Sequence, residues 1–176
     1  MRRSSIATHG SVVTMAQKFF VSIDATKQGR LRGESQTRGE KDGKIPGVRF
    51  TLETVSPRDA ATGQASGKRQ HKPILFTKEW GAASPQLYSA LVSNEILKSV
   101  VFEFTKTNPN GEESVFHKIT LTNATVSNIR SYLDLTDTSG DPFDGRTLED
   151  VSFVYQKIAM ENLDGKTTAI DDWQVR

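Results

Sequence analysis

Apolar and polar residues alternate along most of the chain, and this spacing predicts β-strands. In residues 18–26, Phe19, Val21 and Ile23 occupy alternate positions. Successive side chains of a strand point to opposite faces, so this pattern places the three together on one buried face. The same reasoning predicts further strands, at residues 31–35, 48–53, 71–79, 96–107, 114–133, 148–160 and 168–175.

Two of these segments depart from simple alternation. In residues 114–133 the apolar set shifts phase, because Ile119 and Leu121 share one face whereas Ala124 lies on the other. A shift of this kind predicts a bulge or a bend. In residues 148–160 apolar side chains occupy both faces, which predicts a strand covered on both sides. One set is Val151, Phe153 and Tyr155, and the other is Val154, Ile158 and Met160.

One segment has helical spacing. Residues 84–93 begin with Ser84, a residue type that caps helix N-termini, followed by Pro85, which suits a first turn because it has no N–H to leave unpaired. Leu87 and Leu91 then fall four apart and form an apolar stripe. We therefore predict one short α-helix, with Ser84 as its cap.

Together these elements predict a mainly β fold. About seven or more strands with a single short helix indicate a β-barrel or a β-sandwich, formed by one domain over residues 18–176. Residues 1–17 show no comparable pattern, and we expect them to be a disordered leader. Met15 stands just before the first predicted strand, so translation starting there is an alternative.

Charge is divided unevenly along the chain. The net charge is +2, but residues 1–80 carry a balance of +8 and residues 81–176 a balance of −6. Such a division predicts either a basic region that binds polyanions or a contact between opposite faces of successive subunits. The candidate contact residues are Arg38, Lys41, Lys44, Arg49, Asp137, Asp141 and Asp144.

The residues that usually carry chemistry do not form recognisable motifs. The absence of cysteine excludes disulfides, thiolate metal sites and a cysteine nucleophile. The cluster KRQHK at residues 68–72, which contains His71, is expected to be a solvent or subunit-contact loop, and His117 to be a partly buried residue of a strand face. Adjacent acidic pairs such as Asp171-Asp172 are expected to be solvated. We therefore expect no catalytic residues, no metal and no cofactor, and the chain is not predicted to be an enzyme.

Membrane and nucleic-acid partners have little support in the sequence. No apolar run approaches the roughly 18–20 residues that a helix needs to span a bilayer, and the N-terminal residues lack the apolar core of a signal peptide. The basic loop at residues 27–49 has no interleaved aromatic residues, and base stacking needs them. The pattern therefore argues against nucleic-acid binding.

Three stretches resemble one known family: LRGES at residues 31–35, KPILFTKEWGAASPQLYSAL at 72–91 and VSFVYQKIAMENLDGKTTAIDDW at 151–173. They are similar to the Hcp family, the haemolysin-coregulated proteins of bacterial type VI secretion, in consistent order over residues 18–175. The resemblance implies a β-barrel protomer with one helix, assembled as a hexameric ring. It also implies stacked rings that form the inner tube, carry effectors in the lumen and contact sheath and spike proteins. Such a protein would leave the bacterial cytoplasm without a signal peptide.

Two other functions compete with this one. The first is a monomeric β-barrel that binds anionic polymers through the basic loops at residues 27–49 and 68–72. The second is a hydrolase that uses scattered carboxylates. The oligomeric state separates the hypotheses, because a ring supports the tube subunit and a monomer that binds heparin or DNA supports the polyanion-binding module.

Overall fold

The structure of the chain is a computed structural model, which describes residues 17–34, 43–107, 110–134 and 145–174. The predicted leader therefore lies outside the described residues except for Gln17, with which the first strand begins. The elements in chain order are β1 Gln17–Ala25, β2 Gly29–Arg30, β3 Ile45–Gly47, β4 Arg49–Thr51, β5 Thr54–Val55, β6 Gln70–His71, β7 Ile74–Glu79, α1 Ala83–Val92, β8 Leu97–Thr107, β9 Glu113–Asp134, β10 Arg146–Asn162 and β11 Thr167–Asp172.

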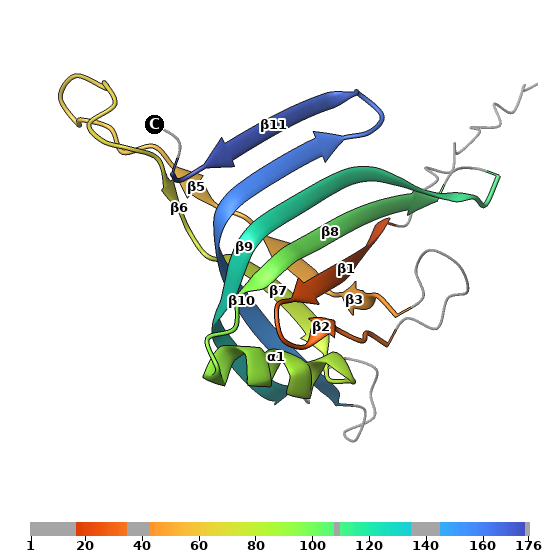
Figure 1. Ribbon diagram of the computed structural model, residues 1–176. Coiled ribbons are helices and arrows are strands. Elements are labelled where there is room, and N and C mark those ends of the chain that lie inside the picture. Colours follow the sequence, from red (N-terminus) through yellow and green to blue (C-terminus); the bar gives the residue numbers. More distant parts are fainter. Residues whose placement is uncertain (1–16, 35–42, 108–109, 135–144, 175–176) are drawn as a thin grey trace, which may run out of the picture.

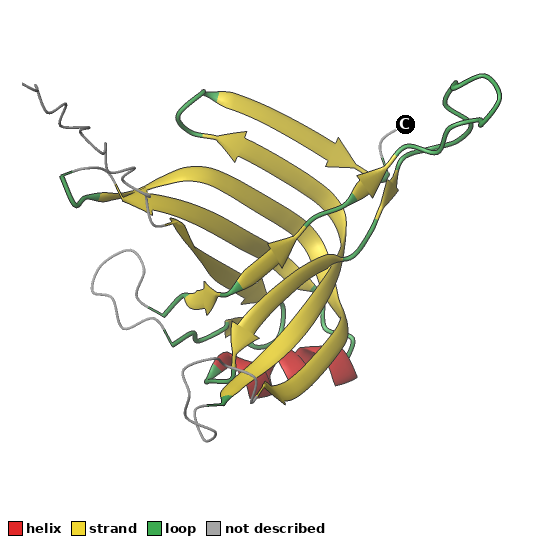
Figure 2. Ribbon diagram, turned by 180° about the vertical axis from the view of Figure 1, so that it is seen from behind, coloured by secondary structure: helices red, strands yellow, loops and turns green. Residues whose placement is uncertain are grey.

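Nine of the strands form one antiparallel sheet with the order β2-β1-β8-β9-β10-β7-β4. Strand β11 pairs with β10, and β3 pairs with β1. The sheet curls back on itself, and α1 lies across one end of it (Figures 1 and 2). The short segment that contains β3 and β4 bridges two parts of the sheet, because β3 pairs with β1 and β4 pairs with β7. Among the described residues no single strand pairs with both β1 and β7, so the body is sandwich-like rather than a closed barrel. The predicted mainly β fold with one short helix is confirmed.

Aromatic side chains fill the interior of the curled sheet. Phe76 of β7, Phe102 of β8 and Phe153 of β10 are completely buried, and their ring centroids lie 5.9 to 6.4 Å apart. Edge-to-face and offset arrangements at this spacing are favourable for aromatic rings. The alternation in three distant parts of the sequence therefore places its aromatic residues in one core, as predicted.

The predicted irregularity in β9 is confirmed. Leu121 and Ala124 are both completely buried although they are three residues apart. Asn123 between them has a φ of 50°, in the left-handed region that asparagine tolerates better than most residues. This residue resets the alternation, so that both halves of the long strand direct apolar side chains into the same core.

The interpretation of β10 as a strand covered on both faces is wrong. Tyr155 and Ile158 are both buried three residues apart, and Met160 packs against the same core, so this strand also changes phase. Only Val154 of the second predicted set points away from the core, and it is 41% exposed. The strand therefore follows the bend of β9, with which it pairs along most of its length.

The helix forms as predicted but is capped differently. It begins at Ala83, and Ser84 lies inside the first turn, so Ser84 as the cap is wrong. Glu34 instead accepts the hydrogen bond of the free Ala83 N–H at 3.1 Å, and a carboxylate at a helix N-terminus is electrostatically favourable. The predicted strand at residues 31–35 is also wrong. The strand in this region is Gly29–Arg30, and Glu34 lies beyond it, where it binds the N-terminus of the helix.

Candidate functional site

The predicted contact residues fall mostly outside the described part of the chain. Arg38, Lys41, Asp137, Asp141 and Asp144 lie in the ranges that are not described. Two others can be placed: Arg49 of β4 is exposed, and Lys44, directly before β3, is only 9% exposed.

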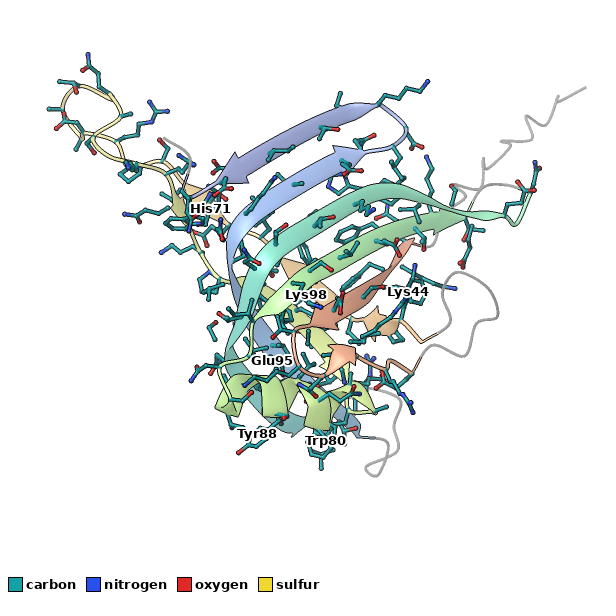
Figure 3. The ribbon with its side chains drawn as sticks, viewed as in Figure 1. Lys44, His71, Trp80, Tyr88, Glu95 and Lys98 are labelled. Carbon is teal, nitrogen blue, oxygen red and sulfur yellow. The ribbon has the colours of Figure 1, made fainter. Side chains whose placement is uncertain are left out.

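Lys44 makes an ion pair within its own chain. Its ammonium group contacts the carboxylate of Glu103 on β8. The two side chains belong to segments that flank β1, so the pair fixes the β3 segment on the sheet. Lys44 is visible beside this segment in Figure 3. Its role as a subunit contact stays a prediction.

A narrow arm, formed by residues 53–72, projects from the body (Figures 1 and 2). It contains β5 and β6, which pair as a separate two-stranded sheet. Within it, every residue is exposed except Pro57 and His71, which are of intermediate exposure when backbone and side chain are counted together. The arm therefore buries little surface against its own body.

The arm nevertheless has a defined internal structure. Near its tip, the carboxylate of Asp59 accepts hydrogen bonds from the backbone N–H groups of Ala61 and Thr62 at 3.0 and 2.8 Å. The bonds from Thr62, joined by that from Ala61, lower the pKa of Asp59. Gly63, at a φ of 70°, completes the turn, and the N–H of Ser66 donates to the carbonyl of Pro57 at 3.0 Å.

His71 joins the root of the arm to the C-terminal strand. Its Nε2 lies 2.6 Å from Oδ2 of Asp171 on β11, and its Nδ1 lies 3.2 Å from the hydroxyls of both Thr54 and Tyr155. Arg69 contacts the same carboxylate oxygen of Asp171. Its Nη2 also donates to the backbone carbonyl of Asp172 at 2.9 Å. The His71 side chain is only 6% exposed.

The electrostatics of this root follow from the contacts. The hydrogen bond from Arg69, with a further one from His71, outweighs burial and lowers the pKa of Asp171. Burial, aided by the negative charge of Asp171, raises the pKa of Tyr155 to about 12. Asp171 is therefore an ionised acceptor near neutral pH, whereas Tyr155 keeps its hydroxyl proton and can donate it to the imidazole.

The order of hydroxyl, imidazole and carboxylate in Thr54, His71 and Asp171 is also that of a hydrolase triad. Here, however, the hydroxyl of Tyr155 lies at the same ring nitrogen as that of Thr54. The guanidinium of Arg69 shares the carboxylate of Asp171 with the imidazole. The arrangement is suited to holding the ring in place as a hydrogen-bonding centre.

These contacts correct two expectations. The segment KRQHK is not a solvent loop throughout, because Arg69 and His71 fasten the arm to β11. Its alternative role as a subunit-contact loop stays a prediction. Asp171 is not a solvated strand-end charge, since it is the shared acceptor of both residues. Sequence reasoning missed this site, because His71 and Asp171 are 100 residues apart and nothing in the local pattern of either indicates the other. His117, by contrast, is half-buried on β9 as expected, with its ring 5.9 Å from that of Phe104.

The end of the body near α1 carries exposed aromatic side chains. Trp80 is 49% exposed and Tyr88 61% exposed, and both are labelled in Figure 3. The indole of Trp80 is fixed by a 2.9 Å hydrogen bond from its Nε1 to the carbonyl of Leu148. A hollow of about 510 Å³ lies between Trp80, Tyr88 and Ile129, and a second of about 230 Å³ lies between Trp80 and Val48.

Two features of the described residues bear on other functions. These residues contain no helix that is both long enough and apolar enough to cross a membrane. They also contain no group of three or more histidine, aspartate or glutamate side chains arranged to hold a metal ion.

Comparison with known proteins gives a consistent result. Residues 20–161 match the family model described as "Type VI secretion system effector, Hcp". The "Major exported protein" of Pseudomonas aeruginosa is 32% identical over 169 residues, which span 91% of this chain and 97% of the relative. Hcp1 from the E. coli EAEC 042 pathovar, solved as a double mutant, is 27% identical with a TM-score of 0.78, covering 90% of this chain and 99% of that one.

A second solved structure agrees. The secreted protein Hcp3 of Pseudomonas aeruginosa is 27% identical with a TM-score of 0.72, and the match covers 91% of this chain and all of that one. The family model spans well over half of the sequence, and the curated relative is matched over nearly its whole length. The chain therefore belongs to the Hcp family of type VI secretion proteins.

Proposed function

We propose that this protein is a non-enzymatic, exported tube subunit of a type VI secretion system. Its protomers assemble into hexameric rings, the rings stack, and effectors travel in the lumen of the resulting tube. The protein is made in the bacterial cytoplasm and leaves the cell with the tube. Sheath and spike proteins are its other partners, and no cofactor takes part.

The observation that carries this proposal is the projecting arm. A ribbon with internal pairing and a carboxylate-capped turn is ordered, yet almost all of its residues are exposed. Ordering a segment costs conformational entropy, and the arm recovers little of that cost by burial against its own body. A second protomer that covers the arm would supply the missing burial.

The exposed aromatic residues near α1 provide a second surface of different chemistry. Trp80 and Tyr88 flank an apolar hollow at one end of the body, and the arm leaves the body elsewhere (Figure 3). Two unlike surfaces on one chain suit heterologous contacts, in which a surface of one subunit meets a different surface of the next. Repetition of such a contact closes a ring or extends a stack.

Negative-stain electron microscopy of the purified protein tests this proposal. We expect ring-shaped particles with six-fold symmetry, and stacks of them at high protein concentration. The matched variant lacks residues 57–66 at the tip of the arm, replaced by a two-residue Asn-Gly turn, and it should remain folded while it assembles less. Monomeric particles that bind heparin would contradict the proposal and favour the polyanion-binding module.

A further inference from the structure

We infer that His71 and Asp171 are positioning residues which fix the direction in which the arm leaves the body. The arm is thereby coupled to the C-terminal strand β11. This inference concerns the conformation of a single chain, and only its consequence for assembly rests on the proposed function.

Backbone pairing alone does not fix the arm. Strands β5 and β6 form a sheet of their own, separate from the nine-stranded sheet of the body. The pairing of β4 with β7 ends at Thr51 and Leu75, and that of the arm begins at Thr54 and His71, extended by one hydrogen bond from the Lys72 N–H to the Glu53 carbonyl at 3.0 Å. Pro73 lies between the two ladders and has no N–H to donate. The pairing is interrupted at this short interval, which is called the hinge below.

Side chains from the arm cross to the body just beyond that hinge. The imidazole of His71 and the guanidinium of Arg69 both bind the carboxylate of Asp171. The hydroxyl of Tyr155, on β10, reaches the other nitrogen of the same imidazole at 3.2 Å. The arm is therefore tied at one point to both strands of the β10–β11 hairpin, whose pairing extends from Lys157 and Asp172 to Asn162 and Thr167.

Burial makes this attachment stiffer than an ordinary surface ion pair. Exposed ion pairs contribute little to stability because water competes for both partners. The side chains of Arg69 and Asp171 are 41% and 30% exposed, but the imidazole between them and the body is only 6% exposed. The Tyr155 residue is 9% exposed, and the ring of Trp173 lies 5.2 Å from that of His71. The site holds a planar ring between fixed partners, so it restrains orientation as well as distance.

Spin-label distance measurements test the inference directly. The chain has no cysteine, so Ala60→Cys at the arm tip and Lys98→Cys on β8 would give the only two labelled positions. Both residues are exposed, and Lys98 is marked in Figure 3. Each labelled protein is diluted into unlabelled protein of the same variant, so that only distances within one chain are measured. We expect a single narrow distance distribution.

Asp171→Ala should abolish the narrow peak and give a broad distribution. Asp172→Ala is the matched control, because it removes a negative charge next to Asp171 without removing a side-chain contact between the arm and the body. Within the described part of the chain, the Asp172 carboxylate accepts a hydrogen bond only from the Gln174 N–H. The Asp172→Ala protein should retain the narrow peak. If Asp171→Ala does not fold by circular dichroism, His71→Phe, which keeps a planar ring at the buried position but removes its hydrogen bonds to Asp171 and Tyr155, should still broaden the peak. A folded Asp171→Ala or His71→Phe protein with the native distribution would overturn the inference.

Ring formation is scored separately on the same samples. Native protein that forms no rings would refute the proposed function and leave the distance result standing. Rings that stack normally when the arm distribution is broad would show that the direction of the arm does not control assembly.

Discussion

Nζ of Lys78 lies 3.0 Å from Oε1 of Glu149, and the two side chains are only 1% and 4% exposed. The pair joins β7 to β10 beneath the first turn of α1. The hydroxyl of Ser84 completes it, accepting from Lys78 at 3.0 Å and donating to Glu149 at 2.8 Å. The sequence pattern predicted Ser84 as a helix cap, but in the structure its hydroxyl forms hydrogen bonds with both members of a buried ion pair.

Removing one member of this pair should be costly. Glu149→Gln leaves the ammonium of Lys78 buried without its counter-charge, a change that typically costs about 3–5 kcal/mol. The double variant Lys78→Met with Glu149→Leu should be much closer to the native protein, because it removes both charges. Urea unfolding of the three proteins measures the difference, and a Glu149→Gln protein as stable as the native one would contradict this account of the pair.

Ser84→Ala should lower the free energy of unfolding by about 1–3 kcal/mol, because it leaves buried polar partners unsatisfied. Ser93→Ala, at the other end of the helix, is a useful control, since the Ser93 hydroxyl donates only to the exposed turn at Ser89. A loss no larger at Ser84 than at Ser93 would show that the buried network does not depend on the Ser84 hydroxyl. Chemical denaturation measures both values.

Phe153→Ala should destabilise the protein by about 3–5 kcal/mol, since it opens a cavity in the aromatic core. Phe153 is completely buried between Phe76 and Phe102. Val154→Ala is the neighbouring control, because Val154 is 41% exposed and should be nearly neutral. Equal effects at the two positions would contradict the orientation of β10.

Glu95 predicts a pH dependence of stability. Burial alone would raise its pKa, but hydrogen bonds from the side chain and backbone of Gln28 and from the backbone of Lys27 hold the pKa below its usual range. The stabilisation is therefore present above the unfolded-state pKa of about 4.3 and is lost as pH falls through the lower folded-state value. The difference in unfolding free energy between the native protein and Glu95→Gln should shrink below about pH 4, and a pH-independent difference would refute this assignment.

Stacking should weaken with salt if the division of charge along the chain sets the contact between rings. Exposed pairs contribute only about 0–1 kcal/mol each, but the symmetry of a ring repeats each contact. Stacks should shorten at about 1 M salt, where the screening length falls to about 3 Å. Single rings, held by apolar packing, should persist.

Charge reversal tests the same contact between rings in a second way. Asp137, Asp141 and Asp144, which lie outside the described residues, are all replaced by lysine. The triple variant should stack less than the native protein at low salt. Electron microscopy across a salt series reads out both experiments. If neither salt nor charge reversal affects the stacks, the uneven division of charge along the chain does not determine stacking.

Local patterns in the sequence predicted the strands and the core, because alternation depends only on neighbouring residues. Residues 18–26 and 96–107 could be placed within a residue or two, and the phase shift near Asn123 was visible as a change in alternation. The contacts that define the candidate site were not predictable in this way. Glu34 caps a helix 49 residues away, and His71 meets Asp171 across 100 residues. Such pairings are set by the curl of the sheet.

The molar mass of the purified protein, measured by size-exclusion chromatography with light scattering at neutral pH and about 0.15 M salt, tests the central claim most directly. We expect a hexameric ring of about 117 kDa, six times the 19.5 kDa of the chain, with larger species as concentration rises. The arm-tip deletion should shift the distribution toward smaller species while its circular dichroism stays native. A native protein that remains at 19.5 kDa over the whole concentration range would contradict assembly as the function of this chain.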